Sequence, residues 1–113
     1  MRIAMPVKDG KLNKHFGHSK QFAILDTDDS KTRVTERRDV TTPPHEPGVI
    51  PAWLAEQGVQ VVLAGGMGER SRNLLAEKGI DVKLGVESHS PEELAAALMA
   101  GTLRTGVNQC DHD

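Results

Sequence analysis

The sequence predicts an α/β domain in which a mixed sheet of about five strands is flanked by helices. Three observations point to this class. The first forty residues carry strand-like segments with no helical pattern between them, and after residue 48 helical and strand-like segments alternate. Strands that are separated by helices run parallel through right-handed crossovers. The length of 113 residues leaves room for one domain of this kind.

Three strands are expected in the first forty residues. Ile3, Met5 and Val7 stand at alternate positions, which is the spacing of a strand. Residues 21–27 form a second apolar run of strand length. Residues 32–38 are rich in β-branched and charged side chains, which is typical of a polar strand at the edge of a sheet. An Asp-Asp-Ser-Lys turn precedes this third strand, so the three strands form an antiparallel meander.

The rest of the domain predicts three helices and two strands, each helix being followed by a glycine that can end it. The elements are a helix over 49–57, a strand over 59–64, a helix over 69–78, a strand over 80–86 and a helix over 91–100. Ser90 can cap the last helix, and Pro91 suits its first position. The whole order is β-β-β-α-β-α-β-α. Residues 1–101 form the single domain, and residues 102–113, which lack periodicity, are expected to be a flexible tail.

Charge and composition exclude several functional classes. A net charge of −2 and a pI near 6.2 argue against a protein that grips nucleic acid through a basic surface. The sequence has no apolar run near the ~18 residues of a membrane span, and its start turns charged too soon for a secretory signal. The single cysteine, Cys110, excludes an intramolecular disulfide and fits a cytoplasmic protein. Helices without a heptad seam favour a monomer.

The segment Lys8–Lys20, the histidine loop, is the first candidate site. It contains the motif His15, Phe16, Gly17, His18 and Ser19. Four lysines against one aspartate make this loop strongly basic within an acidic chain, and such a loop attracts anions. The two imidazoles can donate hydrogen bonds or ligate a metal, and the phenylalanine in so polar a loop is expected to cover a ligand. A solvated lysine-rich loop that binds nothing is the alternative.

A run of glycines, the glycine turn, is the second candidate site. Gly65, Gly66, Met67 and Gly68 follow the most apolar strand and open a helix. Backbone N–H groups at a helix N-terminus favour anions, and a methionine thioether can touch a soft, sulfur-rich ligand. The run lacks the spacing of a phosphate-binding P-loop or a dinucleotide site, so a purely structural turn is the alternative. If the strands before the two candidate sites are parallel, both sites converge on one crevice at the same sheet edge.

Other residues give weaker signals. Cys110 and His112 could ligate copper, zinc or the edge of an iron–sulfur cluster, but two ligands are too few for a structural zinc site. A tail that merely carries a cysteine is the alternative. His45 and His89 are expected to be surface histidines. The strands lack the carboxylates of a two-metal nuclease, and the sequence shows neither a catalytic triad nor an acid/base pair, so no enzyme is predicted.

The opening segment Met1–Val7, the His-Phe-Gly-His-Ser motif, the Gly-Gly-Met-Gly turn and the element order together resemble the dinitrogenase iron–molybdenum cofactor biosynthesis family. This family includes NifX-like proteins, the C-terminal part of NifB and the orange protein of sulfate reducers. The likeness covers about residues 1–101. It implies a ribonuclease-H-like fold without nuclease activity and a preformed, anionic metal–sulfur cluster as ligand. It also implies partners such as a ParA/Mrp-type ATPase or other cluster-assembly proteins.

The resemblance further implies that residues 15–19 and 65–68 line the cluster pocket. A molybdenum–copper sulfide is the first expectation for the cluster, and an iron–molybdenum cofactor-type cluster is the second. Because neither loop contains a cysteine, electrostatic and hydrogen-bonded holding is favoured over thiolate ligation. The prediction is a non-enzymatic carrier or scaffold. Two alternatives stay open: a regulatory or interaction module that binds a small anion or nucleotide, and an enzyme that uses His15 or His18 as a general acid.

Overall fold

The first part of the chain forms the antiparallel half of the sheet. The computed structural model describes residues 1–13, 16, 19–28, 30, 32–44, 46 and 48–106. Its first four strands are β1 (Arg2–Lys8), β2 (Lys11–Leu12), β3 (Gln21–Thr27) and β4 (Val34–Thr41). β1 pairs with β3, placing Ile3 opposite Leu25, and β3 pairs with β4 on its other side. β2 turns back onto β1 through Asp9 and Gly10, which both have positive φ.

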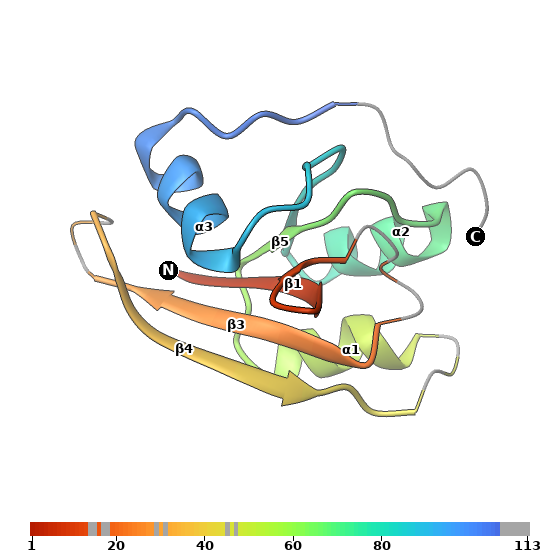
Figure 1. Ribbon diagram of the computed structural model, residues 1–113. Helices are drawn as coiled ribbons and strands as arrows, with labels where there is room; N and C mark the ends of the chain where they lie inside the picture. Colours follow the sequence, from red (N-terminus) through yellow and green to blue (C-terminus); the bar gives the residue numbers. More distant parts are fainter. Residues whose placement is uncertain are drawn as a thin grey trace.

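The second part of the chain adds the parallel half. Its elements are α1 (Val49–Glu56), β5 (Val61–Leu63), α2 (Glu69–Glu77), β6 (Asp81–Lys83) and α3 (Pro91–Ala100). β5 runs parallel to β1, with Val61 opposite Ile3, and β6 runs parallel to β5. The strand order is β4-β3-β1-β5-β6, with the short β2 attached to β1 (Figure 1). The predicted mixed α/β architecture, with the first strand parallel to the strand after the first helix, is therefore confirmed.

Helices cover both faces of this sheet, α1 and α2 on one face and α3 on the other (Figure 1). Successive strand residues point to opposite faces, so alternation along β1, β3 and β5 divides the core in two. The first core contains Ala4, Phe22, Ile24 and Val62 with Ile50, Leu54 and Leu75 of the helices. The second core contains Ile3, Met5, Ala23, Leu25, Val61 and Leu63 with Leu94 and Ala95 of α3.

Four strands differ from the sequence-based expectation, among them β5, which spans Val61–Leu63 where a strand over 59–64 is expected. β2 forms where only a loop is expected, because the side chain of Leu12 is buried and its backbone pairs with Val7. β4 begins two residues and ends three residues later than expected. The strand expected over 80–86 ends at Lys83, since Gly85 has a φ of +70° and leaves the extended conformation. The segment after β6 instead bonds to the end of β5, with Val86 N–H donating to Ala64 O at 3.2 Å.

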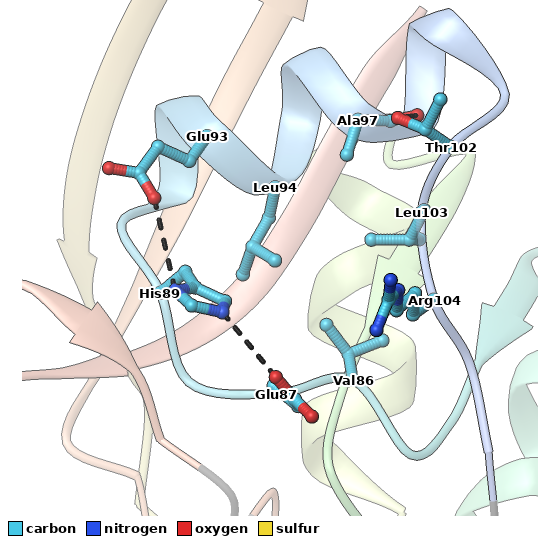
Figure 2. Close-up of a pocket in the computed structure, with 9 residues that line it drawn as sticks. All are labelled: Val86, Glu87, His89, Glu93, Leu94, Ala97, Thr102, Leu103 and Arg104. Atoms are coloured by element: carbon cyan, nitrogen blue, oxygen red, sulfur yellow. Dashed lines mark hydrogen bonds and ion pairs between the residues drawn. The ribbon is translucent and has the colours of Figure 1, made fainter.

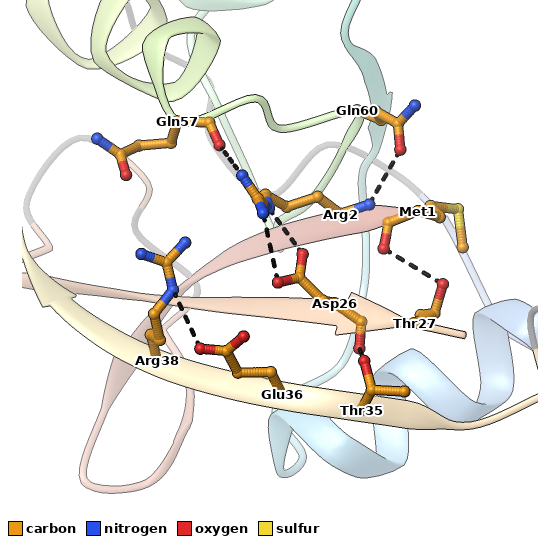
Figure 3. A network of polar contacts seen from close by, with 9 residues as sticks. All are labelled: Met1, Arg2, Asp26, Thr27, Thr35, Glu36, Arg38, Gln57 and Gln60. Carbon is orange, nitrogen blue, oxygen red and sulfur yellow. Dashed lines mark hydrogen bonds and ion pairs between the residues drawn. The ribbon is translucent and has the colours of Figure 1, made fainter. Parts of the chain in front are cut away.

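The amino-terminal edge of the sheet is held by an ion-pair network (Figure 3). The guanidinium of Arg2 donates to the Asp26 carboxylate at 2.7 Å and to the Gln57 carbonyl, while its backbone N–H donates to the Gln60 side chain at 3.0 Å. The hydrogen bond from Arg2 is the main cause that lowers the pKa of Asp26. This network joins β1 and β3 to the end of α1 and the start of β5.

The last helix begins as expected. The Ser90 hydroxyl accepts a hydrogen bond from Glu93 N–H, Pro91 occupies the first turn, and Gly101 ends the helix with a φ of 76°. The first five residues of the expected tail do not leave the domain: the side chain of Leu103 packs against the second core, and Gly106 N–H donates to Leu84 O at 3.0 Å. In the described part of the chain, the helices are too short and too polar to traverse a membrane.

Candidate functional site

The two candidate loops lie at the same edge of the sheet. β1 and β5 are parallel, so both end there, and antiparallel β3 begins there with Gln21 opposite Val7. The histidine loop joins the end of β1 to the start of β3, and the glycine turn joins β5 to α2. This carboxyl edge is where open α/β sheets usually bind their ligands.

Phe16 and Met67 connect the two loops through the first core. The Phe16 side chain is 3% exposed and that of Met67 is 1% exposed, and both belong to the same hydrophobic cluster. The Phe16 ring meets the Phe22 ring edge-on, with centroids 5.4 Å apart. Both side chains therefore anchor their loops to the core beneath the edge. As described, they present almost no surface to a ligand.

Ser19 also lies inside the structure. It is fully buried, and its hydroxyl accepts a hydrogen bond from the Asn13 amide at 3.3 Å. Its carbonyl accepts a hydrogen bond from the Thr42 hydroxyl at 3.0 Å. A buried hydroxyl needs such partners, and these bonds tie the end of the histidine loop to the segment after β4. Sequence reasoning expects this hydroxyl to face a ligand, whereas in the described arrangement it supports the loop.

The glycine turn presents backbone to the edge. Gly65 and Gly66 are buried. Gly68 is the N-cap of α2; its backbone is extended, and as a glycine it offers no side-chain capping hydrogen bond. The Gly65 carbonyl accepts a hydrogen bond from Gly85 N–H at 3.0 Å, which fixes the turn against the chain that follows β6. The start of α2 thus combines a glycine cap with the positive end of a helix dipole.

Charged side chains surround both loops. Lys8, Lys11 and Lys20 of the histidine loop are exposed, against one exposed aspartate, Asp9. The first turn of α2 adds exposed Glu69, Arg70 and Arg72, a set that sequence reasoning overlooked. Their position directly after the glycine turn is the signal that could have identified them. The described charges at this edge are mainly basic, which favours an anionic ligand.

Several predicted site residues lie outside the described residues. They are His15, Gly17 and His18 of the histidine loop and Cys110 and His112 near the chain end. His45 is likewise outside them. Within the part of the chain that the structure describes, no three His, Cys, Asp or Glu side chains gather closely enough to hold a metal ion.

A small cavity of about 220 Å³ opens on the α3 side of the molecule (Figure 2). Its floor is apolar and its rim is charged; it is lined by Val86, Glu87, His89, Glu93, Leu94, Ala97, Thr102, Leu103 and Arg104. His89, expected to be a surface residue, is about half exposed, with its ring nitrogens 3.6 Å from the Glu87 carboxylate and 3.8 Å from that of Glu93. Sequence reasoning missed this cavity, which adjoins the second core and not the core that holds Phe16 and Met67.

The fold and the carboxyl edge together define a small α/β domain whose candidate site is built from backbone and basic side chains in the described residues. The chain belongs to the dinitrogenase iron–molybdenum cofactor family, whose model matches residues 1–101. Family membership and fold agree with the resemblance carried by the two loop motifs.

Individual relatives match most of the chain, two in structure and one in sequence. The crystal structure of PH0822 is 29% identical, with a TM-score of 0.83, and the match covers 94% of this chain and 96% of that one. The apo form of the orange protein from Desulfovibrio gigas is 23% identical, with a TM-score of 0.72 and coverage of 95% and 93%. An uncharacterised protein of Methanocaldococcus jannaschii, MJ0580, is 28% identical over 85 residues, which are 73% of this chain and 72% of that protein.

Proposed function

We propose that this protein is a non-enzymatic carrier or scaffold for a preformed, anionic metal–sulfur cluster, held between the histidine loop and the glycine turn. The observation that carries the proposal is the burial of Phe16 and Met67 in one cluster, which anchors both loops to the first core at the carboxyl edge. Membership in the iron–molybdenum cofactor family supports a metal–sulfur cluster as the cargo.

The chemistry of the edge suits an anion that brings its own ligands. Exposed lysines supply positive charge, and the backbone at the start of α2 can donate to sulfides. His15 and His18 are proposed to donate further hydrogen bonds. Charge-assisted hydrogen bonds contribute about 1.5–3 kcal/mol each, so a few can hold a polyanion without a covalent bond. Glu69 opposes this, and the neighbouring Arg70 and Arg72 offset its charge.

The two loops fit outer-sphere holding of the cluster better than thiolate coordination. Neither loop contains a cysteine, so neither can supply a thiolate ligand. We therefore favour a molybdenum–copper sulfide as cargo, with an iron–molybdenum cofactor-type cluster as the second candidate. Cys110 and His112 are proposed as additional soft ligands from the chain end. Delivery to a ParA/Mrp-type ATPase, a monomeric state and a cytoplasmic location belong to the same proposal.

A second candidate function has one observation in its favour. A basic edge beside a helix start with a glycine cap would also suit phosphate or a nucleotide, as expected of a regulatory module. The two candidates differ in the ligand: a sulfide cluster is coloured and soft, whereas a phosphate is colourless and hard. A binding experiment with both kinds of anion separates them.

Intrinsic fluorescence makes that experiment simple. Trp53 is the single tryptophan and the chain has no tyrosine, so emission reports one site. The Trp53 ring lies 5.7 Å from that of Phe22, which in turn contacts Phe16 of the histidine loop. A coloured cluster at the edge therefore quenches this emission by energy transfer.

The test is anaerobic titration of the protein with tetrathiomolybdate and copper(I), followed by visible absorption, metal analysis and Trp53 emission. The proposal expects retained metal–sulfur charge-transfer bands, quenched emission and no displacement by excess phosphate or ATP. Colourless protein whose emission responds to phosphate or ATP alone would support the regulatory module. Protein that retains neither kind of anion would contradict both functions.

A further inference from the structure

The segment after α3 passes over Gly85, a residue whose backbone bonds to the glycine turn. Thr102 and Leu103 N–H groups both donate to Ala97 O, at 2.9 and 3.1 Å, so the chain turns back sharply at the helix end. The Leu103 side chain packs against the second core, and Gly106 N–H then reaches Leu84 O at 3.0 Å. We call residues 102–106 the C-terminal strap.

Gly85 lies between the strap and the glycine turn. Its N–H donates to Gly65 O at 3.0 Å, while its Cα faces the backbone of Gly106. A Cβ added to Gly85 would stand 2.4 Å from the carbonyl carbon of Gly106, closer than any real contact. Gly85 also has a φ of +70°, a conformation that side chains disfavour. Only glycine allows the strap to lie directly on this residue.

We propose that the C-terminal strap positions the glycine turn through Gly85, so that attachment of the strap raises the affinity of the candidate site for its anion. The segment 84–86 has left the sheet ladder and is held by its bonds to Ala64 and Gly65 on one side and by Gly106 on the other. Removing one side leaves a short exposed segment that opens more easily. The Gly65 carbonyl then loses the hydrogen bond from Gly85 N–H, and the orientation of the first turn of α2 is no longer fixed. The affinity part of this inference rests on the proposed function of the turn.

Two truncations isolate the strap. A chain that ends at Leu103 keeps the packing of that side chain on the core but loses the Gly106 contact. A chain that ends at Gly106 keeps the strap and loses Cys110 and His112. Both truncated chains end in a carboxylate at a new position, so a difference between them does not come from the charge of the terminus.

Two substitutions test the contact between Gly85 and Gly106. Gly85→Ala places a methyl group against the Gly106 backbone. Gly106→Ala is the matched control, because a Cβ there would meet only Gly85 O at an ordinary 3.8 Å. Gly85→Ala combined with the chain ending at Leu103 shows whether the two changes act through one contact.

Two measurements are made on every variant. Hydrogen exchange of the Gly85 and Gly65–Gly68 amides, followed by NMR, measures how readily the glycine turn opens in the absence of a ligand. Titration with tetrathiomolybdate and copper(I), followed by Trp53 quenching, reports affinity. We expect the chain ending at Leu103 to exchange faster at these amides than the chain ending at Gly106, and to bind the cluster about fivefold or more weakly than that chain. Gly85→Ala should do the same relative to the full chain, and the combined variant should lose less than the sum of the two effects. Gly106→Ala should stay within about twofold of the full chain. The chain ending at Gly106 serves as the reference for the shorter truncation, and any loss that it shows against the full chain is assigned to the missing Cys110 and His112.

The proposal is overturned if the chain ending at Leu103 exchanges and binds like the full chain. It is also overturned if both truncations weaken binding equally, because residues 107–113 would then be responsible. If the full chain takes up no cluster, the proposed function fails while the exchange data still decide whether the strap holds the turn. Faster exchange with unchanged cluster affinity would confirm the contact and reject its effect on the site.

Discussion

The ring of Phe16 stands edge-on to the ring of Phe22, with centroids 5.4 Å apart and planes at 85°. This contact fastens the histidine loop to β3, and Phe22 in turn meets Trp53 of α1. Because the same cluster includes Met67, the histidine loop and the glycine turn are both fixed to the first core.

Removal of the Phe16 ring should therefore destabilise the whole domain. We expect Phe16→Ala to lower the free energy of unfolding by about 3 kcal/mol, because it leaves a cavity in the first core. Phe16→Leu, which keeps most of the volume, should cost less than half as much. Urea denaturation measures both. A loss below about 0.5 kcal/mol in Phe16→Ala would show that this ring is not part of the core.

The Arg2–Asp26 ion pair should make the free energy of unfolding depend on pH in the acid range. The pKa of Asp26 is lowered in the folded state by the Arg2 hydrogen bond, so its ionised form stabilises the fold at pH values above the ordinary pKa of an aspartate. That contribution is lost as the pH falls through the lowered folded-state pKa. Asp26→Asn should cost about 1 kcal/mol at pH 7, a modest value because the pair is partly exposed.

Unfolding measured in urea between pH 2 and pH 7 tests this expectation. The difference between the native chain and Asp26→Asn should shrink toward zero at the acid end. Glu56→Gln, at an exposed position of α1, is the control and should leave the curve nearly parallel to that of the native chain. A gap between Asp26→Asn and the native chain that stays constant with pH would contradict the assigned cause.

The two histidines should be needed for the ligand and not for the fold. We expect His15→Ala with His18→Ala to bleach the reconstituted chromophore and to abolish Trp53 quenching, because two hydrogen-bond donors to the cluster are lost. His89→Ala, beside the cavity at the second core, is the matched control and should retain colour. Unchanged colour and affinity in the double variant would remove the histidine loop from the site.

Salt should weaken cluster binding steeply if charge holds the cluster. The Debye length is about 10 Å at 0.1 M salt and about 3 Å at 1 M, so exposed lysines are progressively screened. Lys11→Gln with Lys20→Gln should weaken binding and flatten its salt dependence. Lys78→Gln, at the far end of α2, should change neither. Affinity that is independent of salt in the native chain would indicate direct metal ligation instead.

Local sequence patterns predicted the architecture of the domain. The alternation of Ile3, Met5 and Val7 identified β1 and its buried face, and helices between the later strands required parallel pairing. These features follow from side-chain periodicity and chain connectivity, which are visible in any short window of sequence. The shared edge of the two loops follows from the same reasoning.

Long-range contacts set the features that the sequence did not reveal. β2 depends on Leu12, whose backbone N–H donates to His89 O and whose carbonyl accepts from Ser88, more than seventy residues away. The early end of β6 depends on the positive φ of Gly85 and on the strap that covers it. Phe16 was expected to cover a ligand, and its burial against Phe22 joins residues whose partnership no periodic pattern encodes.

Binding of one cluster by both loops is tested most directly by an NMR titration with a preformed molybdenum–copper sulfide, whose molybdenum(VI) and copper(I) are diamagnetic. We predict that the imidazole signals of His15 and His18 and the amide signals of Gly65–Gly68 shift together and saturate at the same cluster concentration. Movement of one set without the other, or saturation at different concentrations, would show that the two loops do not share a ligand.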